Sequence, residues 1–401
     1  MSAILPVNAP HPVAYRDRKR ILWAMPLFMC LLVLVGPIAH MMGATSQFWF
    51  FAPALFSYIG IMLMDVVIGE DLSNPPEEAV PHLETDAYYR WVIYLTLPVM
   101  WACTAFTLHY LSTHELPWYS WFITVITCGT LMGALGLAIS HELGHKRDTL
   151  SRKLGLIQAV LVGYGHFSIE HNRGHHRHVA TPEDPASSQL GESIYRFMFR
   201  ELPGAFFRAW DLECERLERL NKSPWSLSND ILQGALITLT VYGGMVAWLG
   251  GDIIPALAIM IPWGAFQLTS ANYIEHYGLK RLKLANGRYE PCRPHHSWNS
   301  NLIASNVITF HLQRHSDHHA NPTRGYQSLR NFEELPTLPT GYLGMFLIAY
   351  IPPLWFSIMN PRVIEATGGD VNRINFVPGQ RERLMRRYGL VESPSNASNP
   401  K

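Results

Sequence analysis

Histidines gather in three short segments of the chain, at spacings that favour binding of a metal ion. In HELGH, His141 and His145 stand four residues apart, so on a helix both imidazoles project from one face about one turn apart. The segment EHNRGHH repeats the four-residue step and adds a neighbour, HLQRHSDHH combines steps of three and four, and NYIEHYG adds one more histidine. The nine candidate metal ligands are His141, His145, His171, His175, His176, His276, His315, His318 and His319.

Nine imidazoles exceed the coordination number of a single first-row metal ion. Two ions with four or five imidazoles each would use them all, so the sequence predicts a dinuclear centre. Imidazole suits iron, zinc, copper and nickel alike, which leaves the metal open. Four further histidines adjoin the clusters, and we expect hydrogen bonding near the site from them rather than metal ligation: His166, His295, His296 and His311.

Acidic residues stand beside the same clusters. A ligating imidazole normally donates its other N–H to a carboxylate or a carbonyl oxygen, so these acids are the predicted partners, although one of them could instead ligate a metal directly. They are Glu142, Glu170, Asp184, Glu275 and Asp317.

The elements that must position these side chains are membrane helices. Only 16% of the residues are charged, against roughly 25% in soluble domains. The apolar residues form six blocks of about the 20 residues that cross a bilayer, and in lipid each block must be a helix to satisfy its backbone. The blocks are residues 21–42, 48–68, 91–111, 118–140, 231–249 and 253–274.

The positions of Lys and Arg predict how the six spans are oriented. The three short outer turns, residues 43–47, 112–117 and 250–252, contain none of the 32 Lys and Arg. Since these residues accumulate on the cytoplasmic side, both termini and every histidine cluster are predicted to be cytoplasmic. A soluble all-helical protein would not explain this asymmetry. The predicted fold is all-α and integral to the membrane: six transmembrane helices in three hairpins, with a cytoplasmic helical cap that carries the histidine-rich site.

The chain divides into three parts by composition. We expect residues 1–20 to be a cytoplasmic segment, 21–388 one membrane domain, and 389–401 a disordered tail or linker. The apolar stretch 341–359 contains Pro352 and Pro353, which favours a re-entrant or interfacial element over a seventh span. The five cysteines form no CxxC pair and are predicted to pack, and a net charge of +1 indicates no nucleic-acid partner.

The histidine clusters resemble those of the three-histidine-box membrane oxygenases. More narrowly, HELGH, EHNRGHH, LQRHSDHH and NYIEHYG, with GEDLSNPPEE and HHSWNSN, are similar to the bacterial membrane-bound alkane hydroxylases, and HYG separates these from desaturases. The resemblance implies two iron ions and oxidation of the terminal methyl of a medium-chain n-alkane to a primary alcohol with O2. It also implies a bacterial inner membrane and electrons from rubredoxin, separate or fused beyond residue 401, fed by rubredoxin reductase and NADH.

An alkane offers no polar group to recognise, so binding must come from burial in an apolar tunnel, at about 0.8 kcal/mol per CH2. The first three spans and the sixth are the expected walls. By the resemblance, the position that limits chain length falls at about Ser57, which is small and predicts acceptance of a longer alkane.

Several other functions fit part of the pattern. HELGH satisfies HExxH, in which two His bind zinc and the Glu is a general base, so an intramembrane zinc protease is one alternative. It needs one further ligand and leaves six clustered histidines unexplained. A fatty-acyl desaturase, or a histidine-box hydroxylase of sterols or aromatic methyl groups, would have nearly the same site. A metal transporter would hold its ligands near the bilayer midplane, and a ferritin-like bundle would need more Glu-x-x-His motifs.

Overall fold

The computed structural model describes residues 15–392, and this part of the chain is helical, with isolated β-bridges but no strand. The predicted all-α fold is confirmed. Residues 1–14 and 393–401 lie outside the described residues, and so does most of the expected N-terminal segment and of the expected tail.

Within residues 15–392, six helical spans are long and apolar enough to cross a membrane, as the sequence predicts. They are Leu22–Met41, Phe48–Ile68, Ala87–Thr113, Trp118–Gly144, Asp230–Leu249 and Gly251–His276. In chain order they contain α1 (Met25–Cys30) with α2 (Val35–Met41), α3 (Phe48–Leu55) with α4 (Ile61–Ile68), α6 (Ala87–Thr113), α7 (Trp118–Thr130) with α8 (Gly136–Gly144), α13 (Asp230–Leu249), and α14 (Ile254–Glu275).

Two helices continue beyond the apolar runs that mark them in the sequence. The third span begins at Ala87 because Asp86 caps it, its carboxylate accepting the N–H of Tyr88 at 2.9 Å. The fourth span runs on to Gly144, since helical hydrogen bonds are internal and do not depend on lipid. This extension carries His141 out of the apolar run on a continuous helix.

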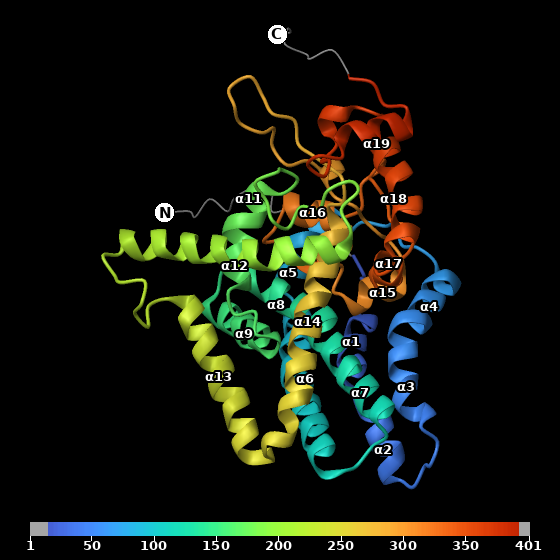
Figure 1. Cartoon of the computed structure of the whole chain (residues 1–401), viewed down its shortest axis with the longest axis vertical. Helices are drawn as coiled ribbons and strands as arrows, with labels where there is room; N and C mark the ends of the chain where they lie inside the picture. The colour runs from blue at the N-terminus through green and yellow to red at the C-terminus, as the bar shows by residue number, and fades with distance from the viewer. Residues whose placement is uncertain (1–14, 393–401) are drawn as a thin grey trace, which may run out of the picture.

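The spans lie side by side below a helical cap, and the long helix α12 (Ile194–Arg219) crosses over them (Figure 1). The fourth span is the central one, because 78% of its apolar window is buried inside the protein, whereas the value for the fifth span is 17%. The remaining cap helices are α5 (Val80–Thr85), α9 (Thr149–Ala159), α10 (Phe167–Glu170), α11 (His176–His178), α15 (Ile303–Ile308), α16 (His315–Ala320), α17 (Tyr342–Ala349), α18 (Pro352–Ala366) and α19 (Arg381–Tyr388).

The apolar stretch near the C-terminus does not form one straight helix. α17 and α18 meet at 119° where Pro352 and Pro353 begin α18. A proline lacks the N–H that would continue the helix, so the break follows from the sequence. The segment therefore turns back on itself beside the sixth span, in keeping with the predicted re-entrant or interfacial element (Figure 1).

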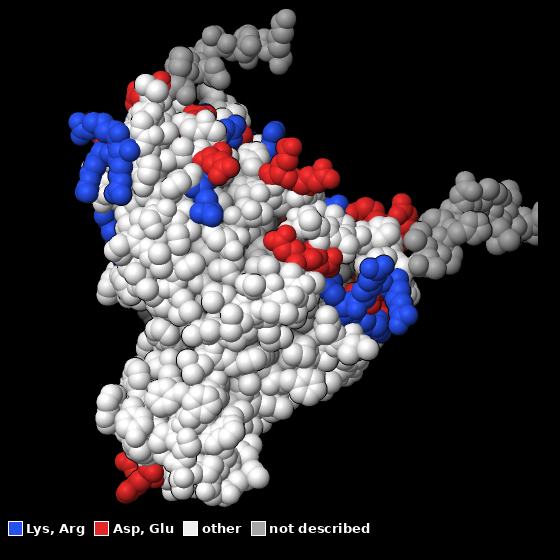
Figure 2. Space-filling view, turned by 90° about the vertical axis from the view of Figure 1, so that its right-hand side faces the viewer, with Lys and Arg blue, Asp and Glu red and all other residues white. Residues whose placement is uncertain are grey.

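Charged side chains gather at the cap end of the molecule. Figure 2 shows Lys, Arg, Asp and Glu around the cap, above a broad uncharged surface with acidic side chains again at the far end. An uncharged belt of this kind is the surface that a helical bundle presents to lipid. The chain is a membrane protein.

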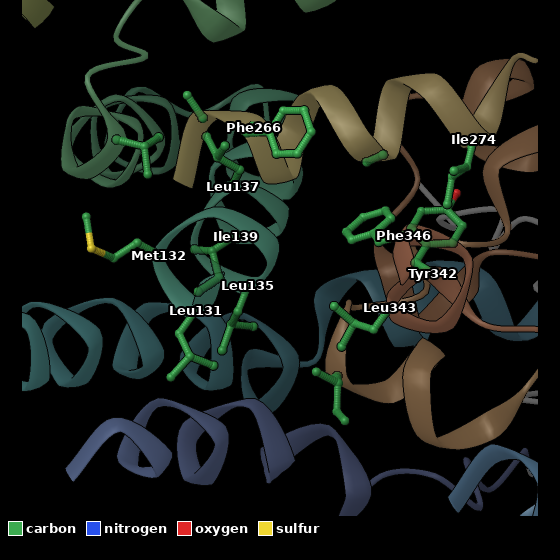
Figure 3. Close-up of a cluster of buried hydrophobic side chains, with 14 of the residues drawn as sticks. Leu131, Met132, Leu135, Leu137, Ile139, Phe266, Ile274, Tyr342, Leu343 and Phe346 are labelled. Atoms are coloured by element: carbon green, nitrogen blue, oxygen red, sulfur yellow. The ribbon is translucent and has the colours of Figure 1, made fainter. Parts of the chain in front are cut away.

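The buried core lies between the fourth span, the sixth span and α17. Leu131, Leu135 and Leu137 of the fourth span lie in one cluster with Phe266 of α14 and Phe346 of α17 (Figure 3). The two spans touch through their backbones at a glycine: a Cβ built on Gly133 would lie 2.1 Å from the carbonyl oxygen of Gly264. Only glycine permits this approach of the two backbones.

Candidate metal centre

The nine histidines that the sequence singles out converge in two groups. The first group has five members, His141, His145, His171, His176 and His318, and the second has four, His175, His276, His315 and His319. In each group, one nitrogen per residue lies within 4.8 Å of all the others. The two groups interleave along the chain, since neighbouring His175 and His176 belong to different groups.

Local backbone geometry explains the interleaving. His175 and His176 point in different directions because they are neighbours on a helix, and the π-helical turn His171–His175, closed by the N–H of His176 on the carbonyl oxygen of His171, brings His171 and His176 together in the first group. In α16, His315 and His319 are four residues apart and share a face, while His318 lies on the adjacent face and joins the first group.

The imidazoles of the first group point their nitrogens at one another. Nε2 of His318 lies 2.9 Å from Nε2 of His141 and 3.0 Å from Nε2 of His176, which lies 3.1 Å from Nε2 of His171. A neutral imidazole has a single N–H, so these nitrogens cannot all be satisfied by hydrogen bonds to each other. A cation shared among the lone pairs satisfies them together.

The second group has the same arrangement. Nε2 of His315 lies 3.1 Å from Nε2 of His276 and 2.9 Å from Nε2 of His319. Nδ1 of His175 is engaged with Asp184 at 2.9 Å, and Nδ1 of His276 with the carbonyl oxygen of His296 at 3.4 Å. Because Nδ1 donates in both residues, Nε2 keeps its lone pair for the centre of the group.

Burial keeps most of these rings neutral. For the ligands outside the membrane spans, burial first and the neighbouring imidazoles second hold the pKa well below its usual value. This applies to His145, His171, His176, His315, His318 and His319. A neutral imidazole is the form that ligates a metal, so the donor set fits transition-metal ions in both groups.

His175 is the exception among these ligands. Burial alone would lower its pKa, but the carboxylate of Asp184 raises it above the usual value. Asp184 is itself fully buried and accepts hydrogen bonds from Ser187 Oγ at 2.6 Å and Arg208 Nη2 at 2.8 Å. The carboxylate is therefore fixed in position and fixes the ring in turn.

The predicted acidic partners separate into two kinds. Asp184 contacts His175, and Glu275 Oε2 lies 3.5 Å from Nε2 of His315. The other three pair with cations instead of histidines: Glu142 with Lys146 at 2.6 Å, Asp317 with Arg330 at 2.9 Å, and Glu170 with Arg208. The five acids were chosen because they stand near histidines in the sequence. Their order in the sequence does not show which side chain each carboxylate faces.

The four histidines beside the clusters belong to neither group. His296 supplies the carbonyl oxygen that faces His276, and its Nε2 lies 3.2 Å from Glu290 Oε1. The Nε2 of His311 lies 2.9 Å from Lys19 Nζ, and His166 packs its ring against Tyr164 with centroids 4.1 Å apart. The side chains of His295 and His296 are grouped with Glu290 and not with the nine ligands.

A largely apolar cavity reaches the histidines. His141 and His171 of the first group, His315 of the second group and Glu275 form its polar end. Its apolar walls come from the fourth span, the sixth span and α17, including Leu137, Tyr342, Leu343 and Phe346 (Figure 3).

These walls differ from the expected first three spans and sixth. The fourth span lines the cavity because the same helix carries His141, a relation that hydropathy does not reveal. Ser57 is buried on the second span but is not among the lining residues, and its hydroxyl donates to the carbonyl oxygen of Pro53 at 2.8 Å.

Two buried groups of imidazoles at the end of six membrane helices, with an apolar cavity leading into them, define an integral-membrane metalloenzyme of the histidine-box class. The profile of the fatty acid desaturase family matches residues 116–349. Alkane 1-monooxygenase 1 of Alcanivorax borkumensis is 48% identical over 382 residues, covering 95% of this chain and 94% of that protein. The alkane 1-monooxygenases of Ectopseudomonas oleovorans and Pseudomonas putida are 47% and 46% identical, covering 96% and 93% of this chain and 95% and 92% of their own lengths.

The chain belongs to the alkane 1-monooxygenase family, within the wider fatty acid desaturase family. The resemblance seen in the histidine clusters is confirmed, and it extends over nearly the whole chain. The chain is a monooxygenase, an oxidoreductase.

Proposed function

We propose that this protein is an alkane 1-monooxygenase that converts the terminal methyl of a medium-chain n-alkane to a primary alcohol. In the balanced reaction, R–CH3, O2, two electrons and two protons give R–CH2OH and water. The observation that carries the proposal is the apolar cavity, whose polar end is made by histidines of both groups. A substrate held there has no polar anchor, as an alkane requires.

We propose that the nine histidines hold two non-haem iron ions, five at one and four at the other. When bound, the irons would supply what the side chains lack, the reduction of O2 and the oxidation of an unactivated C–H bond. Imidazole shells suit several metals, and iron is favoured because the reaction is a redox reaction. Asp184 would orient the ring of His175, and the carbonyl oxygen of His296 the ring of His276.

The cavity walls would perform substrate binding and water exclusion. Leu137, Leu343 and Phe346 bury the alkyl chain, at about 0.8 kcal/mol per CH2. An extended chain between the fourth and sixth spans would point one methyl towards the three imidazoles at the cavity's end. Regioselectivity for the terminal carbon then follows from the narrow approach along the two helices.

We propose reduced rubredoxin as the electron donor, supplied by rubredoxin reductase and NADH. The sequence has five cysteines and no CxxC pair, so the electrons must come from another protein or domain. We further propose a bacterial inner-membrane location with the termini and the metal centre on the cytoplasmic side. The three outer turns without Lys or Arg support this orientation.

The alternatives are disfavoured by specific contacts. In a zinc protease of the HExxH type, Glu142 would act as the general base beside the metal. Here its carboxylate pairs with Lys146 at 2.6 Å and accepts the N–H of Tyr326 at 3.2 Å. For a desaturase, the identity of 46–48% to alkane 1-monooxygenases over at least 93% of the chain argues for alkanes instead.

The first test is metal content of the detergent-purified protein together with octane hydroxylation, with rubredoxin, rubredoxin reductase and NADH added. We expect about two iron ions per chain, one for each group of histidines, and 1-octanol as product. One zinc ion with no alcohol would support the protease, and a desaturated acyl product would support the desaturase.

Single substitutions test the ligand scheme. Replacing His141, His171, His276 or His315 by Ala should abolish hydroxylation, because each removes one ligand from a buried group. His178→Ala is the matched control, since His178 follows the segment EHNRGHH but its ring faces Glu183 near the surface. Near-normal activity in two of the four variants would contradict the nine-ligand scheme.

A further inference from the structure

The cavity has a defined depth along the two helices that form its walls. On the fourth span, its lining runs from His141 back to Gly133, and on the sixth from Glu275 back to Gln267. Each path is eight residues, about 12 Å at a rise of about 1.5 Å per residue. A zigzag of C–C bonds of about 1.5 Å advances about 1.25 Å per bond, so an extended chain of roughly ten carbons spans this depth.

Gln267 lines the deep end of the cavity and belongs to a hydrogen-bonded network between the spans. The Tyr58 hydroxyl donates to Gln267 Oε1 at 3.0 Å and lies 3.1 Å from Thr130 Oγ1. Trp263 Nε1 donates to Thr130 Oγ1 at 2.8 Å, and Gln267 Nε2 lies within donating distance of the Tyr350 hydroxyl at 3.4 Å. These five residues, here called the Tyr58–Gln267 network, join the second, fourth and sixth spans to the corner between α17 and α18.

The cavity cannot continue between the fourth and sixth spans below this point. A Cβ built on Gly133 would lie 2.1 Å from the carbonyl oxygen of Gly264, and one on Gly129 would lie 2.7 Å from that of Met260. The two backbones are in contact over about one helical turn. A longer alkane could therefore advance only by displacing the network.

An alkyl chain cannot replace the hydrogen bonds that it would break. Gln267 and Tyr58 lie within the membrane spans, where water is not at hand to satisfy a freed amide or hydroxyl. A methyl group offers neither a donor nor an acceptor, so pushing past Gln267 leaves polar groups unpaired in an apolar setting. Displacing the network with an alkyl chain is therefore energetically unfavourable.

We propose that the Tyr58–Gln267 network is the stop that limits the length of the alkane this enzyme accepts. The inference rests on the proposed function and adds its specificity determinant. It assigns the length limit to Gln267 on the sixth span, which lines the cavity, and to Tyr58, which holds Gln267 by a hydrogen bond from the position next to Ser57.

The test is the alcohol product from a series of n-alkanes from octane to hexadecane, using the full chain with its electron donors. Gln267→Ala removes the network's side chain from the cavity floor. We expect it to raise the ratio of dodecane to octane turnover by about tenfold or more, since two further buried CH2 groups are worth at least that factor. Tyr58→Ala should shift the ratio in the same direction, and Ala134→Leu, which fills the deep end, should lower it.

Thr104→Ala is the matched control. Thr104 is buried in the third span, its hydroxyl bonds to the carbonyl oxygen of Met100 at 2.9 Å, and it does not line the cavity. We expect the wild-type ratio from it. Metal content identifies any variant that fails to fold, and Ala134→Leu tests the proposal if both enlarging variants do.

The outcomes distinguish a failure of the proposed function from a failure of the proposed stop. A wild-type protein that makes no alcohol from any alkane would overturn the proposed function. Alcohol from the wild type, with an unchanged ratio in folded Gln267→Ala or Tyr58→Ala, would overturn the network as the stop while leaving the function intact.

Discussion

Asp184→Asn should weaken metal binding at one group of histidines and spare the other. Asp184 Oδ2 accepts from His175 Nδ1 at 2.9 Å, while Oδ1 accepts from Arg208 Nη2 at 2.8 Å. Asparagine has a single acceptor oxygen, so one of these donors would face an N–H₂ group. If His175 loses its partner, its ring is no longer held with Nε2 directed at His276, His315 and His319.

The size of the effect can be estimated from the role of such partners. Loss of the group that orients a ligating histidine typically costs about 10- to 100-fold in metal affinity. Only the four-histidine group contains His175, so its ion should be lost first as a chelator is raised. We expect metal content to fall from about two ions to about one per chain at a chelator concentration that leaves the wild type loaded, and octane hydroxylation to fall with it.

Metal analysis after dialysis against a graded chelator series measures this directly. Glu183→Gln is the control. Glu183 stands next to Asp184 in the sequence and makes a similar carboxylate–imidazole pair with His178 at 3.3 Å, but its side chain is 59% exposed. It should follow the wild-type curve. If Asp184→Asn keeps both ions along the wild-type curve, or loses both together, the separation into a five- and a four-histidine group is refuted.

Two further predictions concern stability, measured as the apparent Tm in detergent at a fixed scan rate. Glu201 is buried against Thr269 and Asn272, and burial first, with Glu170 and Asp184 adding, raises its pKa to about 7 from 4.5. The protonated carboxyl therefore contributes its full stabilisation below pH 4.5, and the free energy of unfolding falls by about 3 kcal/mol as the pH rises through 7. Glu201→Gln should raise the Tm at pH 8 and not at pH 4.5. Equal effects at both pH values would contradict the raised pKa. Gly133→Ala should lower the Tm by several degrees, because the new Cβ meets a backbone oxygen that cannot move away. Gly244→Ala is the control and should leave the Tm unchanged, because no atom lies within 4 Å of its Cβ. Similar Tm values for the two variants would contradict the backbone contact.

Much of the architecture follows from local pattern. Apolar runs near the length of a bilayer crossing specify six helices whatever surrounds them, because lipid leaves the backbone no other way to pair. The break at Pro352 is equally local, since a proline cannot continue a helix. The helix ends are less predictable: the fourth span runs to Gly144, beyond its apolar run, because helical hydrogen bonding does not depend on hydropathy.

The sequence by itself singled out the nine histidines that the fold brings together in two groups, since nine histidines at helical spacings in polar segments have few other physical uses. Only the tertiary structure decided how they divide, which acids face them and where the cavity lies. His175 and His176 are adjacent yet serve different groups, and Glu142 sits inside HELGH yet pairs with Lys146. The reason is that a ligand's type is a property of one residue, whereas its partner depends on how helices distant in sequence pack against each other.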